Sequence, residues 1–518
     1  MKTNKLFAIL AAGLLLTSCN DWLQESPKSF DDGSIRTETQ AEARVNRLYR
    51  NGAPTQISST GAYRGGNYSC TSFLTGYYSS SYWGQETDVY EDAMLTRQNN
   101  TPDVCVRMTN DVWTSCFREI NVANDAIAQI SKLPASTKTK ALIAEAKFFR
   151  AFNYFHLVKH FGGVPVNTEP TSSLEDGDKP RNSAEEVYAL IEKDLKDAIE
   201  GLPAGSMQKN GNRVGKTVAQ ALLADVYMQK GDKANAKTYL AAVVNSGDYA
   251  LVQGDDMKEN SYINKLRTQD GTSEAVYFVE YDRDLSTMNR RTGNVFDDSM
   301  EAEADALGIY RLVIAPRESY CAVYDPQTDL RIQNKQFFVT EATVQVKADG
   351  TMWTWKWDGI TRGDWYYLEE SCLYDGKGTK DWNIYRYAEI LLDYAECLGK
   401  AEGAKYLAQV MHRADLTGKT AADIEAELSR LSDQEFAEAC WTERIKEFPL
   451  EYKIWDLCLR TKKFPVINEN HTVTYVDLIG AKNGYGATFT ESDLLWPVPV
   501  QEIQRNPNLE QNPGYARQ

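Results

Sequence analysis

Two stretches of this chain carry the pattern of a helical hairpin, in which small side chains let a pair of helices pack closely. In residues 216–246, alanine recurs at the contact positions of both helices, and Gly231 separates them. Residues 385–414 repeat this pattern in a looser form. A hairpin of this size leaves one apolar face uncovered unless further helices stack on it. We therefore expect a mainly helical chain in which neighbouring segments complete an array.

The spacing of small residues in both stretches is that of tetratricopeptide-type hairpins. Other segments show the apolar period of helices, at residues 38–49, 104–130, 138–161 and 184–199. We expect the last three to complete the array. The fold class that follows is all-α: a scaffold of tetratricopeptide-like helical hairpins with long loop-rich insertions and a few short β-strands.

Local signals fix the ends of two of these helices. Phe148 and Phe152 repeat at helical spacing in the 138–161 segment, which predicts a deeply buried helix. The run Gly162-Gly163-Val164-Pro165 should end it, because glycine caps a helix and proline cannot continue one. Ser183 and Glu186 have the spacing of a capping box, so a new helix should begin there.

Two regions lack a helical period and are predicted to be long loops, which often carry function. The first runs from Asn51 to Thr101 and the second from about Leu251 to Lys380. Within the second, residues 275–281 and 352–357 have the composition and alternation of strands.

The amino-terminal residues have the features of a lipoprotein leader. Lys2 and Lys5 precede an apolar run, Leu6 to Leu16, that is too short to span a bilayer. The run ends in Leu16-Thr17-Ser18-Cys19, which resembles a bacterial lipobox. We expect residues 1–18 to be a signal peptide, Cys19 to be lipidated, and residues 19–28 to tether the folded body to the membrane.

Charge and cysteine usage narrow the choice of partners and cofactors. The formal net charge is −16, which argues against a nucleic-acid partner. Cys70, Cys105 and Cys116 lie close enough in sequence for one disulfide, but their spacing does not decide the pairing. No CxxC occurs and the four histidines are scattered, so we expect no metal site and no cofactor.

Several motifs follow one another in an order known from one protein family. They are Cys19-Asn20-Asp21-Trp22-Leu23, the run from Glu145 to Phe155, the stop at 162–165, the run from Arg386 to Glu396, Trp496-Pro497-Val498-Pro499, and the run from Asn506 to Tyr515. On these motifs the chain resembles the SusD/RagB-like outer-membrane lipoproteins over nearly its whole mature length. One departure is Pro449-Leu450-Glu451-Tyr452-Lys453, where the family usually continues with a glycine-arginine step.

The resemblance implies a single body at residues 29–518, with a SusD-like part at about 29–250 and a RagB/SusD part at about 270–518. It further implies a non-enzymatic protein, anchored to the outer membrane on its extracellular side. Such a protein captures glycans and delivers them to a SusC-like TonB-dependent transporter. Because the family's helical motifs are structural, ligand contacts are expected from the irregular loops.

Sugar recognition needs exposed aromatic rings and a few polar groups that bind hydroxyls. The candidates are Trp83, Tyr82, Tyr78, Arg64, Asn67 and Gln85 in the first loop region, and Asn294, Phe296, Tyr310, Trp365 and Tyr366 in the second. Trp83 is the first choice. The alternative for its ring, packing in the core of its own loop, is left open.

Two other functions share these features. A surface glycoside hydrolase would use a pair of carboxylates, which an acidic chain can hide, although no recognised hydrolase motif is present. A peptide-binding uptake lipoprotein of the same fold is the second alternative. The aromatic loops favour glycans over both.

Overall fold

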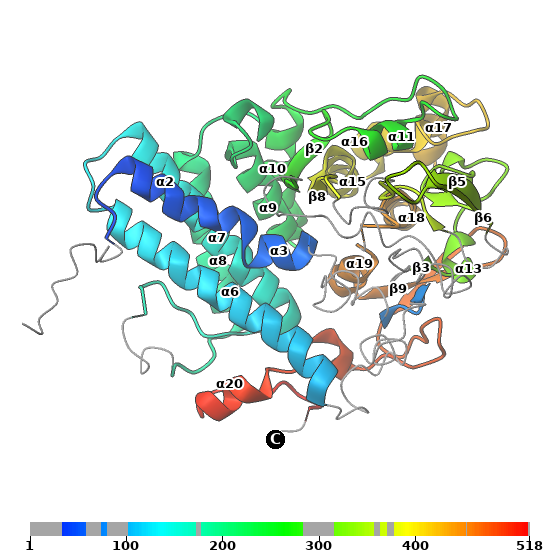
Figure 1. Ribbon diagram of the computed structural model, residues 1–518. Coiled ribbons are helices and arrows are strands. Elements are labelled where there is room, and N and C mark those ends of the chain that lie inside the picture. Colours follow the sequence, from blue (N-terminus) through cyan, green and yellow to red (C-terminus); the bar gives the residue numbers. More distant parts are fainter. Residues whose placement is uncertain are drawn as a thin grey trace, which may run out of the picture.

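The protein is described from a computed structural model that covers residues 34–58, 74–79, 102–171, 178–282, 315–356, 363–369, 378–451 and 453–515. Helices dominate this part of the chain (Figure 1). They are α2 (Glu38–Asn46), α3 (Ala53–Ser58), α6 (Pro102–Ile130), α7 (Thr137–Phe161), α8 (Ala184–Gly201), α9 (Lys216–Gln229), α10 (Lys233–Val244), α11 (Tyr262–Thr268), α13 (Glu318–Cys321), α15 (Tyr387–Leu398), α16 (Lys400–His412), α17 (Ala421–Leu428), α18 (Asp433–Glu447), α19 (Ile454–Thr461) and α20 (Val500–Arg505).

Helices that follow one another in the chain pack on one another in space. α6 contacts α7, α7 contacts α8, α8 contacts α9, and the α9–α10 hairpin packs on α15, which pairs with α16. Figure 1 shows this progression from the blue and cyan helices on one side of the molecule to the yellow and orange ones on the other. Both expected hairpins are present, and the all-α, tetratricopeptide-like fold is confirmed.

The predicted helix boundaries are explained by their caps. The Ser183 Oγ accepts a hydrogen bond from the Glu186 N–H at 3.2 Å, and the Glu186 carboxylate accepts one from the Ser183 N–H at 2.8 Å. At the end of α7, Gly162 has a φ of +71°, a conformation that favours glycine, and its N–H donates to the Val158 carbonyl at 3.0 Å. The capping box and the glycine stop therefore act as the sequence predicts.

α7 lies at the centre of the first half of the chain. Every residue from Phe148 to Phe161 is buried, so this helix is covered on all sides. Its one buried arginine, Arg150, is matched by a bidentate pair of hydrogen bonds to Asp194 of α8, both 2.7 Å long. A buried charge needs such a partner, and the pair ties α7 to α8.

The described strands form two-stranded antiparallel ladders. The pairs are β1 (Tyr78–Ser79) with β3 (Ala315–Pro316), β2 (Ala275–Val279) with β8 (Trp382–Arg386), β4 (Phe338–Val339) with β7 (Gly363–Asp364), β5 (Glu341–Gln345) with β6 (Met352–Lys356), and β9 (Lys463–Ile467) with β10 (Val473–Asp477). The strands predicted at 275–281 and 352–357 are thus found, slightly shorter than expected.

The two loop regions are more structured than the sequence suggests. α3 lies inside the first region, where no helix was expected, and α11 and α13 lie inside the second. Each is too short to display a helical period. α3 is fixed instead by a distant residue, because the Asn153 Oδ1 of α7 accepts a hydrogen bond from the Ala53 N–H at 2.9 Å.

A buried ionic cluster joins the second half of the chain. Arg386 and Arg413 share the carboxylates of Glu274 and Glu447, at distances of 2.6–3.1 Å, and Arg386 also binds Glu451 at 2.8 Å. All five side chains are almost completely buried. The cluster connects β8 and the segment before β2 to the ends of α16 and α18, and it includes Glu451 from the run that departs from the family pattern.

Two further expectations concern cysteines and the membrane. Cys116 is buried and unpaired, so it takes part in no disulfide; Cys70 and the side chain of Cys105 lie outside the described residues. Burial raises the pKa of the Cys116 thiol. Among the described helices, none has the length and apolar character needed to cross a bilayer.

Candidate functional site

Two segments that carry candidate ligand residues begin next to each other on the helical body. Ser58 ends α3 directly before residues 59–73, and Tyr281 lies just before residues 283–314. The Tyr281 hydroxyl donates to the Ser58 Oγ at 2.9 Å and to the Ser58 carbonyl at 3.0 Å. Burial raises the pKa of Tyr281 to about 12, so its hydroxyl remains a donor at neutral pH.

The same two regions also meet at β1 and β3. β1 precedes residues 80–101, and β3 follows residues 283–314. The two short strands pair with each other, with Tyr78 opposite Pro316 and Ser79 opposite Ala315. The residue before segment 80–101, Ser79, and the residue after segment 283–314, Ala315, are therefore neighbours on the helical body.

A third segment, residues 483–485, packs against the residues just before β1. The Gly484 N–H donates to the Thr75 carbonyl at 3.0 Å, and the backbones at Gly76 and Gly484 come so close that a Cβ on Gly76 would lie 2.4 Å from the Gly484 nitrogen. Arg317 donates to the carbonyls of Gly76 and Gly484 at 2.9 and 3.1 Å, and its guanidinium lies 4.6 Å from the Tyr485 ring centre. We call residues 74–79, 315–317 and 483–485 the loop junction.

Two candidate rings are not available to a ligand. Tyr78 is fully buried in the loop junction, 5.1 Å from the Tyr320 ring, and its hydroxyl donates to the Pro449 carbonyl. Tyr366 is 1% exposed and packs against Phe337 at 5.4 Å. These rings are part of the hydrophobic core, so the structure corrects their proposed role as sugar-stacking surfaces.

Trp365 is half-buried, and its ring already has polar partners. The Arg267 guanidinium lies 4.2 Å from the ring centre and the Lys335 ammonium lies 5.3 Å from it. The indole N–H donates to the Asn264 Oδ1 at 3.1 Å. These cation–π contacts hold the ring in one orientation, so a sugar would meet an ordered but partly covered surface.

The other candidates lie outside the described residues and remain predictions. They are Arg64, Asn67, Tyr82, Trp83, Gln85, Asn294, Phe296 and Tyr310, together with the proposed lipidation site Cys19. What the structure adds is the position of described residues next to the segments that contain these loop candidates, at the Ser58–Tyr281 contact and at the loop junction.

An acidic side chain also lies beside the start of the second loop segment. The Asp381 Oδ1 accepts a hydrogen bond from the Tyr281 N–H at 3.0 Å, while the Asp381 N–H donates to the Asp270 Oδ1 at 3.0 Å. Burial, and then the negative charge of Asp270, raise the pKa of Asp381 to about 7. The root of this loop thus contains a carboxyl group that changes charge near neutral pH.

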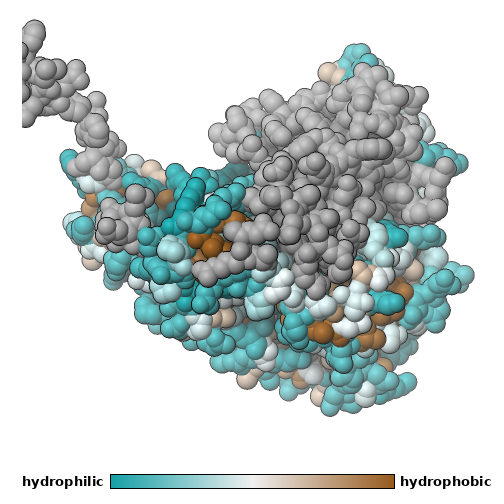
Figure 2. Space-filling view, turned by 90° about the horizontal axis from the view of Figure 1, so that it is seen from below, coloured by the Kyte–Doolittle hydropathy of each residue, from teal (hydrophilic) through white to brown (hydrophobic). Residues whose placement is uncertain are grey.

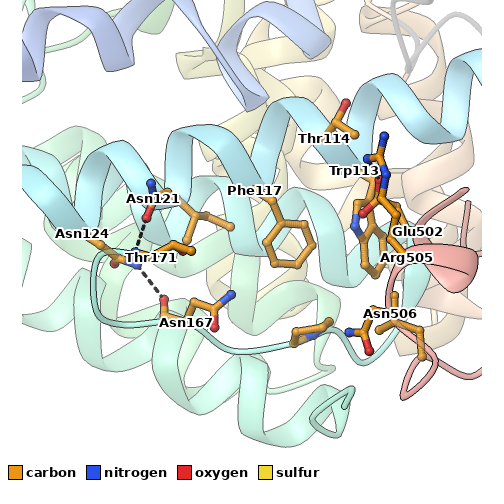
Figure 3. Close-up of a pocket in the computed structure, with 13 residues that line it drawn as sticks. Trp113, Thr114, Phe117, Asn121, Asn124, Asn167, Thr171, Glu502, Arg505 and Asn506 are labelled. Carbon is orange, nitrogen blue, oxygen red and sulfur yellow. Dashed lines mark hydrogen bonds and ion pairs between the residues drawn. The ribbon is translucent and has the colours of Figure 1, made fainter. Parts of the chain in front are cut away.

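A cavity that the sequence did not predict lies beside α6, with a volume of about 290 Å³ (Figure 3). Trp113, Thr114, Phe117 and the asparagines 121 and 124 line it on the side of α6. The segment after α7 contributes Asn167 and Thr171, and α20 with the residues that follow it contributes Glu502, Arg505, Asn506 and Leu509. Figure 1 shows α20, in red, lying below α6. The three walls come from parts of the chain that are far apart in sequence, so no local motif marks the site.

The surface on this side of the molecule carries both apolar and hydrophilic side chains. Figure 2, which views the protein from below, shows small apolar patches among predominantly hydrophilic side chains in the part that is described.

Comparison with known proteins gives consistent matches. A family model described as the SusD family matches residues 200–515, and one described as starch-binding associating with outer membrane matches residues 21–228. SusD-like protein P38 of Formosa agariphila is 24% identical over 98% of both chains. SusD-like protein P2 of the same organism is 25% identical over 97% of this chain and 98% of the relative.

Solved structures show the same fold. A SusD superfamily protein from Parabacteroides distasonis superposes with a TM-score of 0.74 at 24% identity, covering 93% of this chain and all of the other. Surface glycan-binding protein A from Bacteroides thetaiotaomicron, solved in complex with laminarihexaose, gives a TM-score of 0.68 at 17% identity, with the same coverage of both chains.

Proposed function

We propose that this chain, which belongs to the SusD family, captures glycans at the cell surface and delivers them to a SusC-like TonB-dependent transporter of the outer membrane. The protein acts as a receptor and leaves its ligand chemically unchanged. Its ligand surface is formed by the two loop regions together.

The observation that carries this proposal is the shared anchoring of the two regions at Ser58–Tyr281 and at β1–β3. Phe296 and Tyr310 lie between these anchors, and Tyr82 and Trp83 follow shortly after β1. Aromatic rings stack on the C–H faces of sugars, and rings from two adjacent loops can contact successive sugars of one chain. A rigid helical body beneath the loops lowers the entropy lost on binding.

The relatives support the ligand class. One structural neighbour is a surface glycan-binding protein solved with laminarihexaose, and another is described as a laminarin-binding SusD-like protein. Their low identity to this chain leaves the sugar and the linkage open, and the loop residues decide both.

Incubating the purified protein with a panel of oligosaccharides tests the proposal against its alternatives. Binding with the sugar recovered intact supports a receptor. Shortened products identify a glycoside hydrolase. Failure to bind any glycan, combined with binding to a peptide library, identifies a peptide-uptake protein of the same fold.

Membrane attachment and the transporter partnership have their own test. Cells that express the protein are labelled with a radioactive fatty acid and then fractionated. We expect label at Cys19 and recovery in the outer membrane, and Cys19→Ala should release an unlabelled protein. Purification of the anchored protein in mild detergent should recover a TonB-dependent transporter. A soluble, unlabelled wild-type protein would contradict the anchor.

A further inference from the structure

We propose that the cavity beside α6 is a second ligand site, which binds one neutral sugar ring independently of the loops. The proposal uses only the described residues around the cavity, so it stands whether or not the loops bind glycans. Figure 3 shows its two aromatic side chains on α6 facing the segment that carries Asn167 and Thr171.

The wall opposite α6 is held in place by side chains of the helices themselves. The Asn124 amide donates to the carbonyls of Asn167 and Glu169, both at 3.1 Å, and the Asn121 Oδ1 accepts from the Thr171 N–H at 2.7 Å. The Tyr154 hydroxyl adds a donor to the Asn167 carbonyl at 3.0 Å. The backbone around Asn167 is therefore fixed, although its side chain is not needed for this.

The third wall is fixed in the same way. The Asn506 amide donates to the Lys179 carbonyl at 2.8 Å, so the chain after α20 is tied to the segment before α8. A cavity whose walls are all anchored before a ligand arrives is preorganised, and less binding energy is lost in ordering it.

The side chain of Asn167 is the strongest indication of a ligand. Its Oδ1 atom is buried and has no hydrogen-bond partner among the described residues. Figure 3 shows this side chain extending toward the part of the cavity that holds Phe117. Leaving a buried acceptor unpaired disfavours the folded state. A ligand hydroxyl that donates to this atom would satisfy it.

The rest of the lining selects a neutral, hydroxylated ligand. The half-buried Phe117 ring, packed 5.0 Å from the almost fully buried Trp113, gives the cavity an apolar wall against which the C–H face of a sugar can lie. Glu502 is the acidic group of the lining and is paired with Arg505 at 2.8 Å, so the two charges compensate each other. The carboxylate would repel an anionic ligand and the guanidinium would repel a cationic one.

The size of the cavity limits the ligand to a small one. A volume of about 290 Å³ is at the lower end of the range for small-molecule sites, which suits a single ring or the terminal sugar of a chain. If the loops hold one part of a polysaccharide, this pocket can hold the end of another chain, and the two contacts together would raise avidity.

Saturation-transfer NMR on the purified full-length protein tests the site, with the methyl glycosides of glucose, galactose and mannose as probes. We expect transfer to at least one probe. Asn167→Leu should reduce the affinity at least tenfold because it replaces the polar amide by methyl groups of nearly the same shape. Its melting temperature should stay unchanged or rise, because an unpaired buried acceptor has been removed. Polysaccharide affinity at the loops should stay within twofold.

Two further variants make the result decisive. Asn245→Leu introduces the same change at an exposed position after α10 and should leave probe binding unchanged. Glu502→Gln removes a carboxylate acceptor from the cavity lining and breaks a pair whose arginine is mostly exposed, so it should weaken the probe several-fold without unfolding the protein. The proposal is overturned if none of the probes shows transfer, or if Asn167→Leu and Glu502→Gln both bind the probe as the wild type does.

Discussion

The hydroxyl of Tyr281 donates hydrogen bonds to the Oγ and the carbonyl oxygen of Ser58, at 2.9 and 3.0 Å, although 223 residues separate them in the chain. Ser58 lies directly before residues 59–73 and Tyr281 just before residues 283–314. This contact and the β1–β3 pair each bring a described residue of the first loop region next to a described residue of the second.

Removing the Tyr281 hydroxyl should loosen this anchor. For Tyr281→Phe we expect a loss of about 1–2 kcal/mol in the free energy of unfolding, because two acceptors on a buried serine lose their donor. Urea denaturation measures the change. Ser58→Ala is the matched variant and should cost less, because the carbonyl acceptor remains. Equal stability of Tyr281→Phe and wild type would mean that the contact does not hold the loop roots together.

The buried ionic cluster should make stability depend on acid pH. The guanidinium groups of Arg413 and Arg386 outweigh the effect of burial and lower the pKa of Glu274 to about 2. Because the folded-state pKa lies below the unfolded one, the stabilisation is complete above about pH 4.5 and is lost as the pH falls toward 2. Glu274→Gln should cost about 3–5 kcal/mol at pH 7, since it leaves buried arginines short of charge.

Urea denaturation between pH 3 and pH 7 checks this dependence. The stability difference between wild type and Glu274→Gln should shrink as the pH falls below 4.5. Glu402→Gln, on the exposed side of α16, is the control and should behave as wild type throughout. A stability difference that does not change with pH would show that the charge of Glu274 is not what stabilises the cluster.

Asp381 should make the stability depend on pH in the opposite direction, with lower stability at higher pH. Its folded-state pKa of about 7 lies above the ordinary value of an aspartate, so the folded protein keeps a proton that the unfolded chain loses. Stability from this group therefore falls as the pH rises from about 4 to 7. Asp381→Asn keeps an acceptor for the Tyr281 N–H and should gain about 1 kcal/mol at pH 8, a value reduced for solvent screening of a half-buried group.

Thermal melting at pH 4.5 and pH 8 separates the two cases for Asp381→Asn. The gain in melting temperature should be present at pH 8 and nearly absent at pH 4.5. A variant less stable than wild type at pH 8 would contradict the assigned charge of Asp381.

The helical scaffold could be predicted from the sequence because its signals are local. Ser183 and Glu186 are three residues apart, Gly162 is adjacent to the helix that it ends, and the small residues of the hairpin at 216–246 mark their own contact face. Such signals depend on a few neighbouring residues, and the structure confirms them.

The features that the sequence did not reveal depend on distant partners. α3 is capped by Asn153, the Tyr78 hydroxyl binds Pro449, and the cavity beside α6 has walls from three separate segments. A tyrosine in a loop region has the same local appearance whether it faces solvent or fills the core. This is why Tyr78 and Tyr366, which are buried, were grouped with ligand candidates.

Glycan affinity of loop variants tests the central claim most directly, namely that the two loop regions form one glycan-binding surface. Calorimetry with the oligosaccharide selected by the panel screen should show that Trp83→Ala and Tyr310→Ala each weaken binding by about 1–3 kcal/mol, with the melting temperature unchanged. Wild-type affinity in both variants, or absence of glycan binding by the wild-type protein, would contradict the account.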